Sequence, residues 1–376
     1  MILKLIKMKL NFLNTILAAL ALSTPMVGFG QGVADDTASS EIVIVPSLEK
    51  FGRSSPFDTT AYAGYLLTYF KDETHSTYFA VSADGYTFTD INNGDPVMLG
   101  AGLAEQKGVR DPHITRGPDG AFYLAMTDLH IYGKRAGYRS TEWQRPEDPY
   151  GWGNNRAIVL MKSYDFIHWT HSDFRVDQAF PELGDIDCAW APQTIYDPAR
   201  KKMMVYFTIR YNNKNAHIYY AYANDAFTRL ETKPERITEI GGIDADICKV
   251  GDQYHMYYVS DAKLFHSVSG SINAGFKVEG KRIDPETVST EAPNVFRRIN
   301  TDTYVLMYDV YGARPNNMGF SETTDFINYV NLGHFNEGVM KGTNFSRPKH
   351  GAVTYLTKAE LKAITEHWKV DLNIER

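Results

Sequence analysis

The sequence predicts an all-β protein, a five-bladed β-propeller that closes by pairing its C-terminal strand with N-terminal strands. Three observations support this prediction. One pattern of strands recurs along the chain. Its first strand, an inner apolar strand, occurs four times in order, and its last strand occurs five times. The missing fifth copy of the first strand lies at the C-terminus, as a lone inner strand. Four-stranded units that repeat and close in this way are typical of β-propellers.

The composition is that of a globular protein without the charge pattern of a nucleic-acid-binding protein. Of the 376 residues, 43% are hydrophobic and 22% are charged, which is ordinary for globular chains. The net charge is −6 and the sequence holds no basic tract, whereas phosphate binding needs clustered Lys and Arg. We therefore expect no nucleic-acid partner.

The N-terminus predicts a secretory signal peptide over residues 1–30. Lys4, Lys7 and Lys9 precede an apolar run at 12–22, and small residues follow. This order is that of a signal peptide, and the run is too short to span a membrane. No Cys lies near the expected cleavage point, so we expect no lipid anchor. The prediction is export to a periplasm or beyond, without a membrane span.

Residues 31–58 are polar and irregular and predict a linker, so a single propeller domain is expected over 59–376. The domain begins with outer strands in residues 64–88 that have no inner strand before them. Inner strands follow, in "RDPHITR" at 110, "WAPQTIYD" at 190, "IDADICKV" at 243 and "EAPNVFR" at 291. The lone strand "HGAVTYLT" at 350–357 completes the fifth unit and closes the ring.

A short helix is predicted at 358–368, with Thr357 as its N-cap and Glu360 near its third position. The alternative fold, a β-sandwich of many hairpins, explains neither the spaced copies nor the match between the two termini. Cys188 and Cys248 are predicted to be small buried residues rather than a disulfide, because they fall at different depths of two inner strands.

Carboxylates occur at nearly the same position in several of the predicted inner strands. When the four inner strands are aligned on the dipeptides DP, AP, DA and AP near their starts, Asp111 and Asp244 occupy the same position, where the other two strands carry Ala191 and Ala292. Glu291 falls one step earlier. Because inner strands of a propeller begin around the central channel, three carboxylates from three blades should converge at one end of that channel.

Converging carboxylates raise one another's pKa and need a counter-charge, so their cost indicates a function. A single Asp at a strand start would be explained as a turn former, but three aligned carboxylates would not. Two carboxylates serve glycoside hydrolysis, where one protonates the leaving oxygen and the other activates water or attacks the sugar. A third carboxylate can tune the acid.

The motifs "RDP", "WAP", "ID" and "EAP" resemble those of glycoside hydrolase family 43, a family of five-bladed propellers, over about residues 60–357. The resemblance implies that Asp111 is the general base, Asp244 the pKa modulator and Glu291 the general acid. It also implies inversion of configuration, with base and acid about 6.5–9.5 Å apart to admit a water. We expect release of terminal sugars from an oligosaccharide or polysaccharide by an α-L-arabinofuranosidase or β-xylosidase.

Two positions depart from the family pattern. Gln193 follows "WAP", where Asp or Glu is common, and Ala245 and Asp246 follow "ID", where Pro is common. Asp246 lies two residues beyond Asp244 and so shares a face with it, which makes Asp246 a rival for the modulator role. These departures bear on substrate preference more than on reaction type.

Further residues are expected to bind substrate, namely Arg110, Asp128, Trp190, Arg347 and His350. Trp190 would offer a platform for a sugar face, and Arg347 would bind a hydroxyl or balance the carboxylates. His350 opens the lone strand and points toward the channel. The resemblance implies a structural metal there, frequently calcium, or a water. A single His provides too few ligands for a metal site by itself, so we expect no required cofactor.

The long insertion at 129–156 carries several aromatic residues, among them Tyr132, Tyr138, Trp143, Tyr150 and Trp152. Long loops on rigid scaffolds often shape binding sites. We expect this insertion to form one wall of the pocket.

Other readings stay open. They are a galactofuranosidase, a fructosidase, a glycoside phosphorylase or a non-catalytic sugar-binding propeller. A phosphorylase would need a basic cluster, for which Arg110, Arg347 and Lys349 are candidates. A binding-only propeller should lack one of the carboxylates, whereas this chain keeps all three. The sugar, the linkage and exo against endo action do not follow from the sequence, and a monomer is expected.

Overall fold

The computed structural model describes residues 42–52, 61–138, 145–277 and 280–372. The predicted signal peptide (1–30) and most of the predicted linker lie outside the described residues. The described part of that linker includes β1 (Val43–Ile44), which pairs in parallel with β8 (His168–Arg175). No helix in the described ranges is long and apolar enough to cross a membrane.

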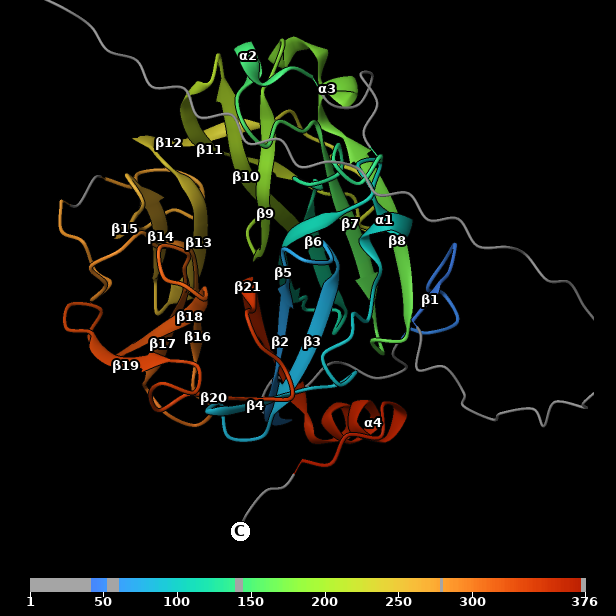
Figure 1. Cartoon of the computed structure of the whole chain (residues 1–376), viewed down its shortest axis with the longest axis vertical. Helices are drawn as coiled ribbons and strands as arrows, with labels where there is room; N and C mark the ends of the chain where they lie inside the picture. The colour runs from blue at the N-terminus through green and yellow to red at the C-terminus, as the bar shows by residue number, and fades with distance from the viewer. Residues whose placement is uncertain (1–41, 53–60, 139–144, 278–279, 373–376) are drawn as a thin grey trace, which may run out of the picture. The chain divides into compact units, whose positions relative to one another are not determined.

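The strands form five separate sheets, one for each blade (Figure 1). Blade one holds β5 (Val109–Arg116), β6 (Phe122–Asp128), β7 (Ala157–Ser163) and β8, with β1 at its edge. Blade two holds β9 (Cys188–Asp197), β10 (Lys202–Tyr211), β11 (Lys214–Tyr222) and β12 (Glu235–Gly241). Blade three holds β13 (Ile243–Val250), β14 (Gln253–Ser260) and β15 (Lys263–Ser269).

The last two blades complete the ring. Blade four holds β16 (Glu291–Arg297), β17 (Tyr304–Val310), β18 (Asn317–Thr323) and β19 (Val330–His334). Blade five combines both ends of the domain, with β21 (Lys349–Thr357), β2 (Tyr62–Phe70), β3 (Thr77–Ser82), β4 (Thr87–Asp90) and β20 (Lys341–Thr343). The predicted five-bladed propeller is confirmed.

Closure of the ring rests on the pairing of β21 with β2, in which Leu67 lies opposite Val353 and Thr68 opposite Ala352. The inner strands β5, β9, β13, β16 and β21 each contact the next one around the ring, and β21 contacts β5 again. The C-terminal strand therefore supplies the inner strand of the fifth blade, as the sequence predicts.

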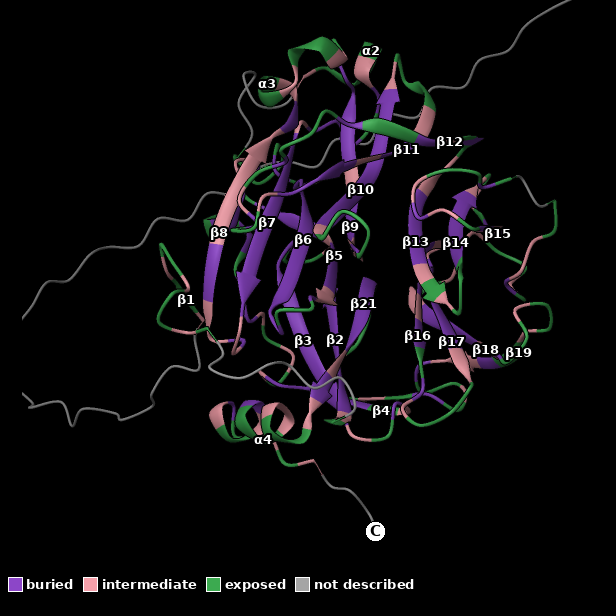
Figure 2. Ribbon diagram, turned by 180° about the vertical axis from the view of Figure 1, so that it is seen from behind, coloured by how far each residue is buried: buried purple, intermediate pink, exposed green. Residues whose placement is uncertain are grey.

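The core lies between adjacent blades, because the inner and middle strands are covered on both faces (Figure 2). Every residue of β3 and β7 is buried, so these strands read as apolar runs rather than as an alternating pattern. At the junction of blades five and one, Phe79 packs with Phe166 and Trp169, at ring-centroid distances of 6.2 Å. Each such buried aromatic side chain contributes on the order of 2 kcal/mol.

The predicted C-terminal helix is present as α4 (Lys358–His367). Thr357 caps it through a capping box with Glu360, and Glu360 also forms an ion pair of 2.6 Å with Arg116 of β5. The remaining helices are short pieces in loops, namely α1 (Gly100–Leu103), α2 (Glu147–Tyr150), α3 (Val176–Ala179) and the 3-10 turn η2 (Pro181–Leu183). Cys188 and Cys248 are both free, as predicted; Cys188 is buried, whereas Cys248 is only partly buried.

Candidate active site

Each inner strand is interrupted by a bulge at one equivalent step near its start. There the pairing register with the neighbouring strand shifts. One residue at this step of each blade has a left-handed backbone, with φ from 26° to 58°: Asp111, Ala191, Asp244, Ala292 and His350. A non-Gly residue in this region costs on the order of 1 kcal/mol. Such strain gathers at functional sites, and a bulge re-aims a side chain.

The bulges also connect the blades. The backbone N–H of a bulge residue donates a hydrogen bond to the second strand of the preceding blade. The pairs are Ala191 to Thr127 Oγ1 (2.8 Å), Asp244 to Thr208 Oγ1 (3.3 Å) and His350 to Asp309 Oδ1 (3.0 Å). These buried amides therefore have hydrogen-bond partners, and the hydrogen bonds hold the strained bulge residues in place.

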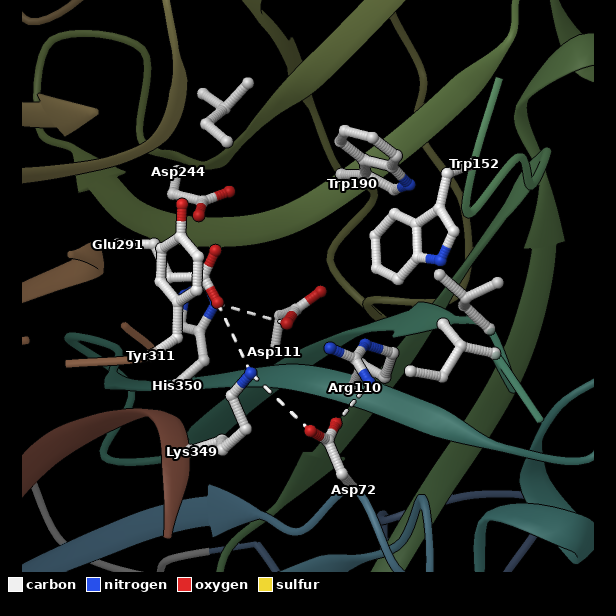
Figure 3. Close-up of a pocket in the computed structure, with 13 residues that line it drawn as sticks. Asp72, Arg110, Asp111, Trp152, Trp190, Asp244, Glu291, Tyr311, Lys349 and His350 are labelled. Carbon is white, nitrogen blue, oxygen red and sulfur yellow. Dashed lines mark hydrogen bonds and ion pairs between the residues drawn. The ribbon is translucent and has the colours of Figure 1, made fainter. Parts of the chain in front are cut away.

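The bulges create a single pocket at the start of the inner strands (Figure 3). Its volume is about 390 Å³. Each blade contributes the residue immediately before its bulge, and these are Arg110, Trp190, Ile243, Glu291 and Lys349. The bulge residues Asp111, Asp244 and His350 complete the polar floor, together with Asp72 and Tyr311. The three carboxylates aligned in the sequence therefore do lie in one cavity.

Asp111 is held as a carboxylate. Its Oδ1 lies 3.2 Å from Nδ1 of His350, and its Oδ2 accepts a hydrogen bond of 2.8 Å from the Thr127 hydroxyl. Burial alone would raise the pKa of Asp111, but His350, Arg110 and Thr127 outweigh burial and hold that pKa well below the ordinary range. Asp111 is therefore ionised at any physiological pH.

His350 is held as a cation by the same contact. Burial would lower its pKa, but Asp111 and the other nearby carboxylates raise the pKa of His350 to about 9. The imidazole is 3% exposed. A buried His between carboxylates thus supplies the counter-charge that converging acidic groups require.

Asp244 sits in a different environment. Burial has the largest effect and, with the neighbouring carboxylates, raises the pKa of Asp244 to about 7. Asp309, on β17 behind the pocket, is likewise raised to a pKa of about 7 by burial and by Glu291, with Lys349 opposing. The site therefore keeps one carboxylate ionised while two others hold protons near neutral pH.

Glu291 points into the pocket beside Lys349, whose Nζ lies 3.4 Å from Glu291 Oε1 (Figure 3). Lys349 also lies 3.7 Å from Asp72 Oδ2, and Asp72 in turn forms a hydrogen bond of 2.7 Å with Arg110. Asp72 follows β2 of the fifth blade, and this acidic residue pairs with both Arg110 and Lys349.

Two Trp side chains form an apolar wall opposite the carboxylates (Figure 3). Trp190 Nε1 donates to the Gly153 carbonyl at 2.8 Å, and the Arg210 guanidinium covers the ring at 4.4 Å. Trp152, from the long insertion, stands edge-on to Trp190 at 6.2 Å and is 53% exposed. The insertion therefore contributes to the pocket wall through Trp152, as expected, while Trp143 lies outside the described residues.

Asp246 belongs to a second set of hydrogen bonds that connect neighbouring blades. It lies two residues after its bulge, like His113 in β5 and Asn294 in β16. Asp246 Oδ2 accepts a hydrogen bond of 2.7 Å from the Val295 amide of the next blade, just as His113 and Asn294 accept from later blades. Asp246 does not line the pocket, so its position does not support the rival modulator role.

Two residues expected to bind substrate lie elsewhere. Asp128 ends β6, where it is 1% exposed and accepts a hydrogen bond from the Gln106 amide at 2.9 Å, behind the pocket wall. Arg347 pairs with Glu73 at 2.7 Å on the surface, and half of its side chain is exposed. Neither residue lines the pocket. The reason is directional, since closeness in sequence to a pocket residue does not fix where a side chain points.

Several pocket residues were not predicted as site residues from the sequence. Lys349 was expected only as part of a basic cluster for phosphate, although it precedes the His350 bulge just as Glu291 precedes its own. Its position in the fifth inner strand, aligned with the other four, is the signal that indicates it. Asp72 and Tyr311 come from loops outside the repeat, so the repeat carries no signal for them.

The family comparison agrees with this geometry. The family described as "Probable glycosyl hydrolase domain", which is related to glycoside hydrolase family 43, matches residues 60–362. The chain belongs to this family. It is a glycoside hydrolase of the five-bladed propeller type. No curated protein matches the chain.

Solved structures with a similar fold are distant in sequence. The catalytic domain of the GH62 α-L-arabinofuranosidase of Coprinopsis cinerea is 17% identical, with 63% of this chain and 73% of that chain covered and a TM-score of 0.43. The GH43 protein BlXynB of Bacillus licheniformis is 12% identical, with coverage of 78% and 58% and a TM-score of 0.49. The exo-β-1,3-galactanase 1,3Gal43A of Clostridium thermocellum is 12% identical, with coverage of 62% and 48% and a TM-score of 0.42.

Proposed function

We propose that this glycoside hydrolase is an inverting enzyme that releases terminal sugars, of the α-L-arabinofuranosidase or β-xylosidase type. The observation that carries the proposal is that Asp111, Asp244 and Glu291, from three blades, line one pocket. The motif resemblance favours the two sugars. The pocket volume of about 390 Å³ is at the small end for ligand sites, which suits the terminal residue of a glycan.

In this proposal Asp111 is the general base. It is ionised, because His350 and Arg110 hold its pKa low, and so it can accept a proton from water as the water oxygen attacks the anomeric carbon. The base of an inverting enzyme must leave room for that water between itself and the sugar. His350 acts as a positioning residue, since it touches Asp111 rather than the reacting atoms.

Glu291 is the general acid, which donates its proton to the leaving glycosidic oxygen as the bond to the anomeric carbon breaks. Lys349, 3.4 Å from Glu291 Oε1, stabilises the carboxylate that forms as the proton leaves. Asp244 is the modulator, an acidic residue of the same pocket whose own pKa of about 7 responds to both Glu291 and Asp111.

The phosphorylase reading is less well supported. It needs free cations in the pocket for phosphate, but Arg110 and Lys349 both have Asp72 as an acidic partner, and Arg347 pairs with Glu73 outside the pocket. The third cation, His350, is likewise paired with Asp111, so among the described residues the pocket offers a dianion no free cation beside its four acidic residues, Asp72, Asp111, Asp244 and Glu291. We therefore favour water over phosphate as the attacking group.

Calcium near His350 stays a prediction, and the residues there fit it poorly. His350 Nδ1 is engaged by Asp111, and a pKa of about 9 keeps the imidazole protonated. A protonated ring has no lone pair for a cation. We assign no step of the reaction to a metal.

We also propose export to a periplasm or beyond, on the basic, apolar and small order of residues 1–30. An exported glycosidase would meet oligosaccharide or polysaccharide substrates outside the cytoplasm. A monomeric state remains an expectation.

The test is hydrolysis of a panel of aryl furanosides and pyranosides by the purified protein. We expect release from one terminal sugar, and a loss of about 10²–10⁴-fold in the Glu291→Gln variant, the usual contribution of a general acid. The matched control is Glu239→Gln, whose side chain is 88% exposed and pairs with Arg236 at 3.0 Å; it should keep full activity.

Undiminished activity in Glu291→Gln would remove Glu291 from the acid role. A folded parent protein that releases no aryl group, yet binds oligosaccharide in calorimetry, would favour the sugar-binding reading. Adding inorganic phosphate checks the phosphorylase reading, because phosphorolysis would yield a sugar phosphate instead of the free sugar.

A further inference from the structure

A second cluster of acidic residues lies behind the wall of the pocket, apart from the residues that line it. Glu105 follows α1, Asp128 ends β6 and Asp173 lies in β8. Their ligand oxygens all lie within 4.8 Å of one another. Two oxygens on opposite sides of one calcium ion, each about 2.4 Å from it, would be about that far apart.

Backbone amides fix two of the carboxylates and leave oxygens free to bind a cation. The Glu105 amide donates to Asp173 Oδ2 at 2.8 Å, and the Gln106 amide donates to Asp128 Oδ1 at 2.9 Å. Asp173 Oδ1 is buried and has no hydrogen-bond partner among the described residues. A buried oxygen in this state calls for a water or an ion.

Gln106 is an independent sign of a ligand. It is 3% exposed, and its Nε2 donates to the Asn154 carbonyl at 3.3 Å, which fixes the orientation of the amide. Its Oε1 is buried and, within the described part of the chain, unpartnered. Glu105, Gln106 and Asp128 line a small cavity of about 10 Å³ together with Ala157, Arg156 and Arg175. This is room for a single water-sized guest.

The charges around the cavity leave the cluster short of cations. Arg175 contacts Glu105 at 3.1 Å and Asp177 at 2.8 Å, and Arg156 contacts Asp177 at 3.4 Å. In the described ranges neither Asp128 nor Asp173 forms an ion pair with Lys or Arg.

We propose that Glu105, Gln106, Asp128 and Asp173 bind a divalent cation, calcium by preference. Carboxylate and amide oxygens are hard ligands, and calcium tolerates their irregular arrangement and completes its shell with water, whereas magnesium demands near-octahedral geometry. The ion would join the segment after α1, the end of β6 and β8. Since Leu129, the next residue after Asp128, lines the pocket, the ion would stiffen that wall.

The test uses the full-length protein after EDTA treatment and dialysis. We expect calorimetric titration with CaCl2 at pH 7.5 to show one calcium per chain and the melting temperature to rise with calcium. The Asp173→Asn variant should bind at least tenfold more weakly. The control Asp302→Asn, with a side chain 90% exposed at another blade, should bind like the parent.

Circular dichroism reports whether each variant is folded. If Asp173→Asn does not fold, Glu105→Gln serves in its place, because the Glu105 side chain is 38% exposed and tolerates the change. No calcium uptake by the parent would overturn the proposal. Equal uptake by the parent and the folded variant would also overturn it, because the ion would then bind elsewhere, for example near His350.

Discussion

At the scale of single residues, His350 decides the charge state of the pocket. It is buried between Asp111 and Asp309, and it donates to one through its ring and to the other through its backbone. This arrangement keeps Asp111 ionised while Asp244 and Asp309 hold protons up to a pH of about 7. The proposed base, Asp111, and the proposed modulator, Asp244, therefore differ in pKa because of where each lies relative to the His350 ring.

The protonation of His350 should appear in the stability of the protein. Its pKa in the folded state is about 9, above the ordinary 6.5, so the proton favours the folded state. This contribution is complete below pH 6.5 and is lost as the pH rises through 9. Between pH 7.5 and 9 we expect the parent to lose on the order of 2 kcal/mol more of unfolding free energy than His350→Gln.

Urea denaturation at a series of pH values measures this difference. Subtracting the two curves removes the titration of groups that both proteins share. Parallel curves for parent and variant across this range would mean that His350 is neutral in the folded protein.

The choice between Asp244 and Asp246 as modulator has a direct test. In Asp244→Asn a carboxylate beside the acid is lost, so the acid gives up its proton more easily and the basic limb of kcat/KM should move to lower pH. Asp246→Asn, in the contact between blades three and four, should lower stability without moving that limb. The pH profiles of both variants decide the matter, and a shift in Asp246→Asn alone would reverse the assignment.

At the scale of elements, one repeated device builds the site. Each inner strand has a bulge near its start. In three blades the bulge residue lines the pocket (Asp111, Asp244 and His350), and in three its amide binds the preceding blade (Ala191, Asp244 and His350). The bulge position can therefore be occupied by Asp, Ala or His while the backbone of the strand keeps the same conformation. Chemistry is varied by the residue at the bulge and the residue before it, while the frame stays constant.

The closing helix α4 offers a clean test of its capping box. Thr357→Ala removes the side chain that accepts from the Glu360 amide, which should cost about 1 kcal/mol of unfolding free energy. Thr365→Ala, in the same helix, removes a hydroxyl that bonds back to the Leu361 and Lys362 carbonyls of that helix, so it should cost nothing. Equal losses in the two variants, measured by chemical denaturation, would contradict the capping role.

At the scale of the whole molecule, the two ends of the domain make one blade. Leu356 of β21 is fully buried in the same core as Leu66 of β2 and Ile364 of α4. Blade five also supplies Asp72, Lys349 and His350 to the pocket. Folding of the ring and assembly of the site should therefore be one event.

This coupling predicts the behaviour of Leu356→Ala. The cavity should cost about 2–5 kcal/mol, and the loss of activity on heating should follow the unfolding transition seen by circular dichroism. Ile327→Ala, at a side chain 73% exposed, serves as the control and should melt like the parent. An activity that survives beyond the structural transition would show that the pocket does not need the closed ring.

The sequence predicted what the repeat encodes. Asp111, Asp244, Glu291, Trp190 and His350 each sit at or next to an aligned step, and all line the pocket. Arg347 and Asp128 lie outside the aligned steps, and neither lines the pocket. Asp72 and Tyr311 belong to loops whose direction depends on tertiary packing, so no local pattern could indicate them.

The measurement that tests the central claim most directly is the configuration of the first sugar released. Proton NMR during the first minutes of hydrolysis, before mutarotation, distinguishes the two anomers. If Asp111 activates a water while Glu291 protonates the leaving oxygen, the product has the opposite anomeric configuration to the substrate. Retained configuration would mean a covalent intermediate on a carboxylate and would contradict the roles given to Asp111 and Glu291.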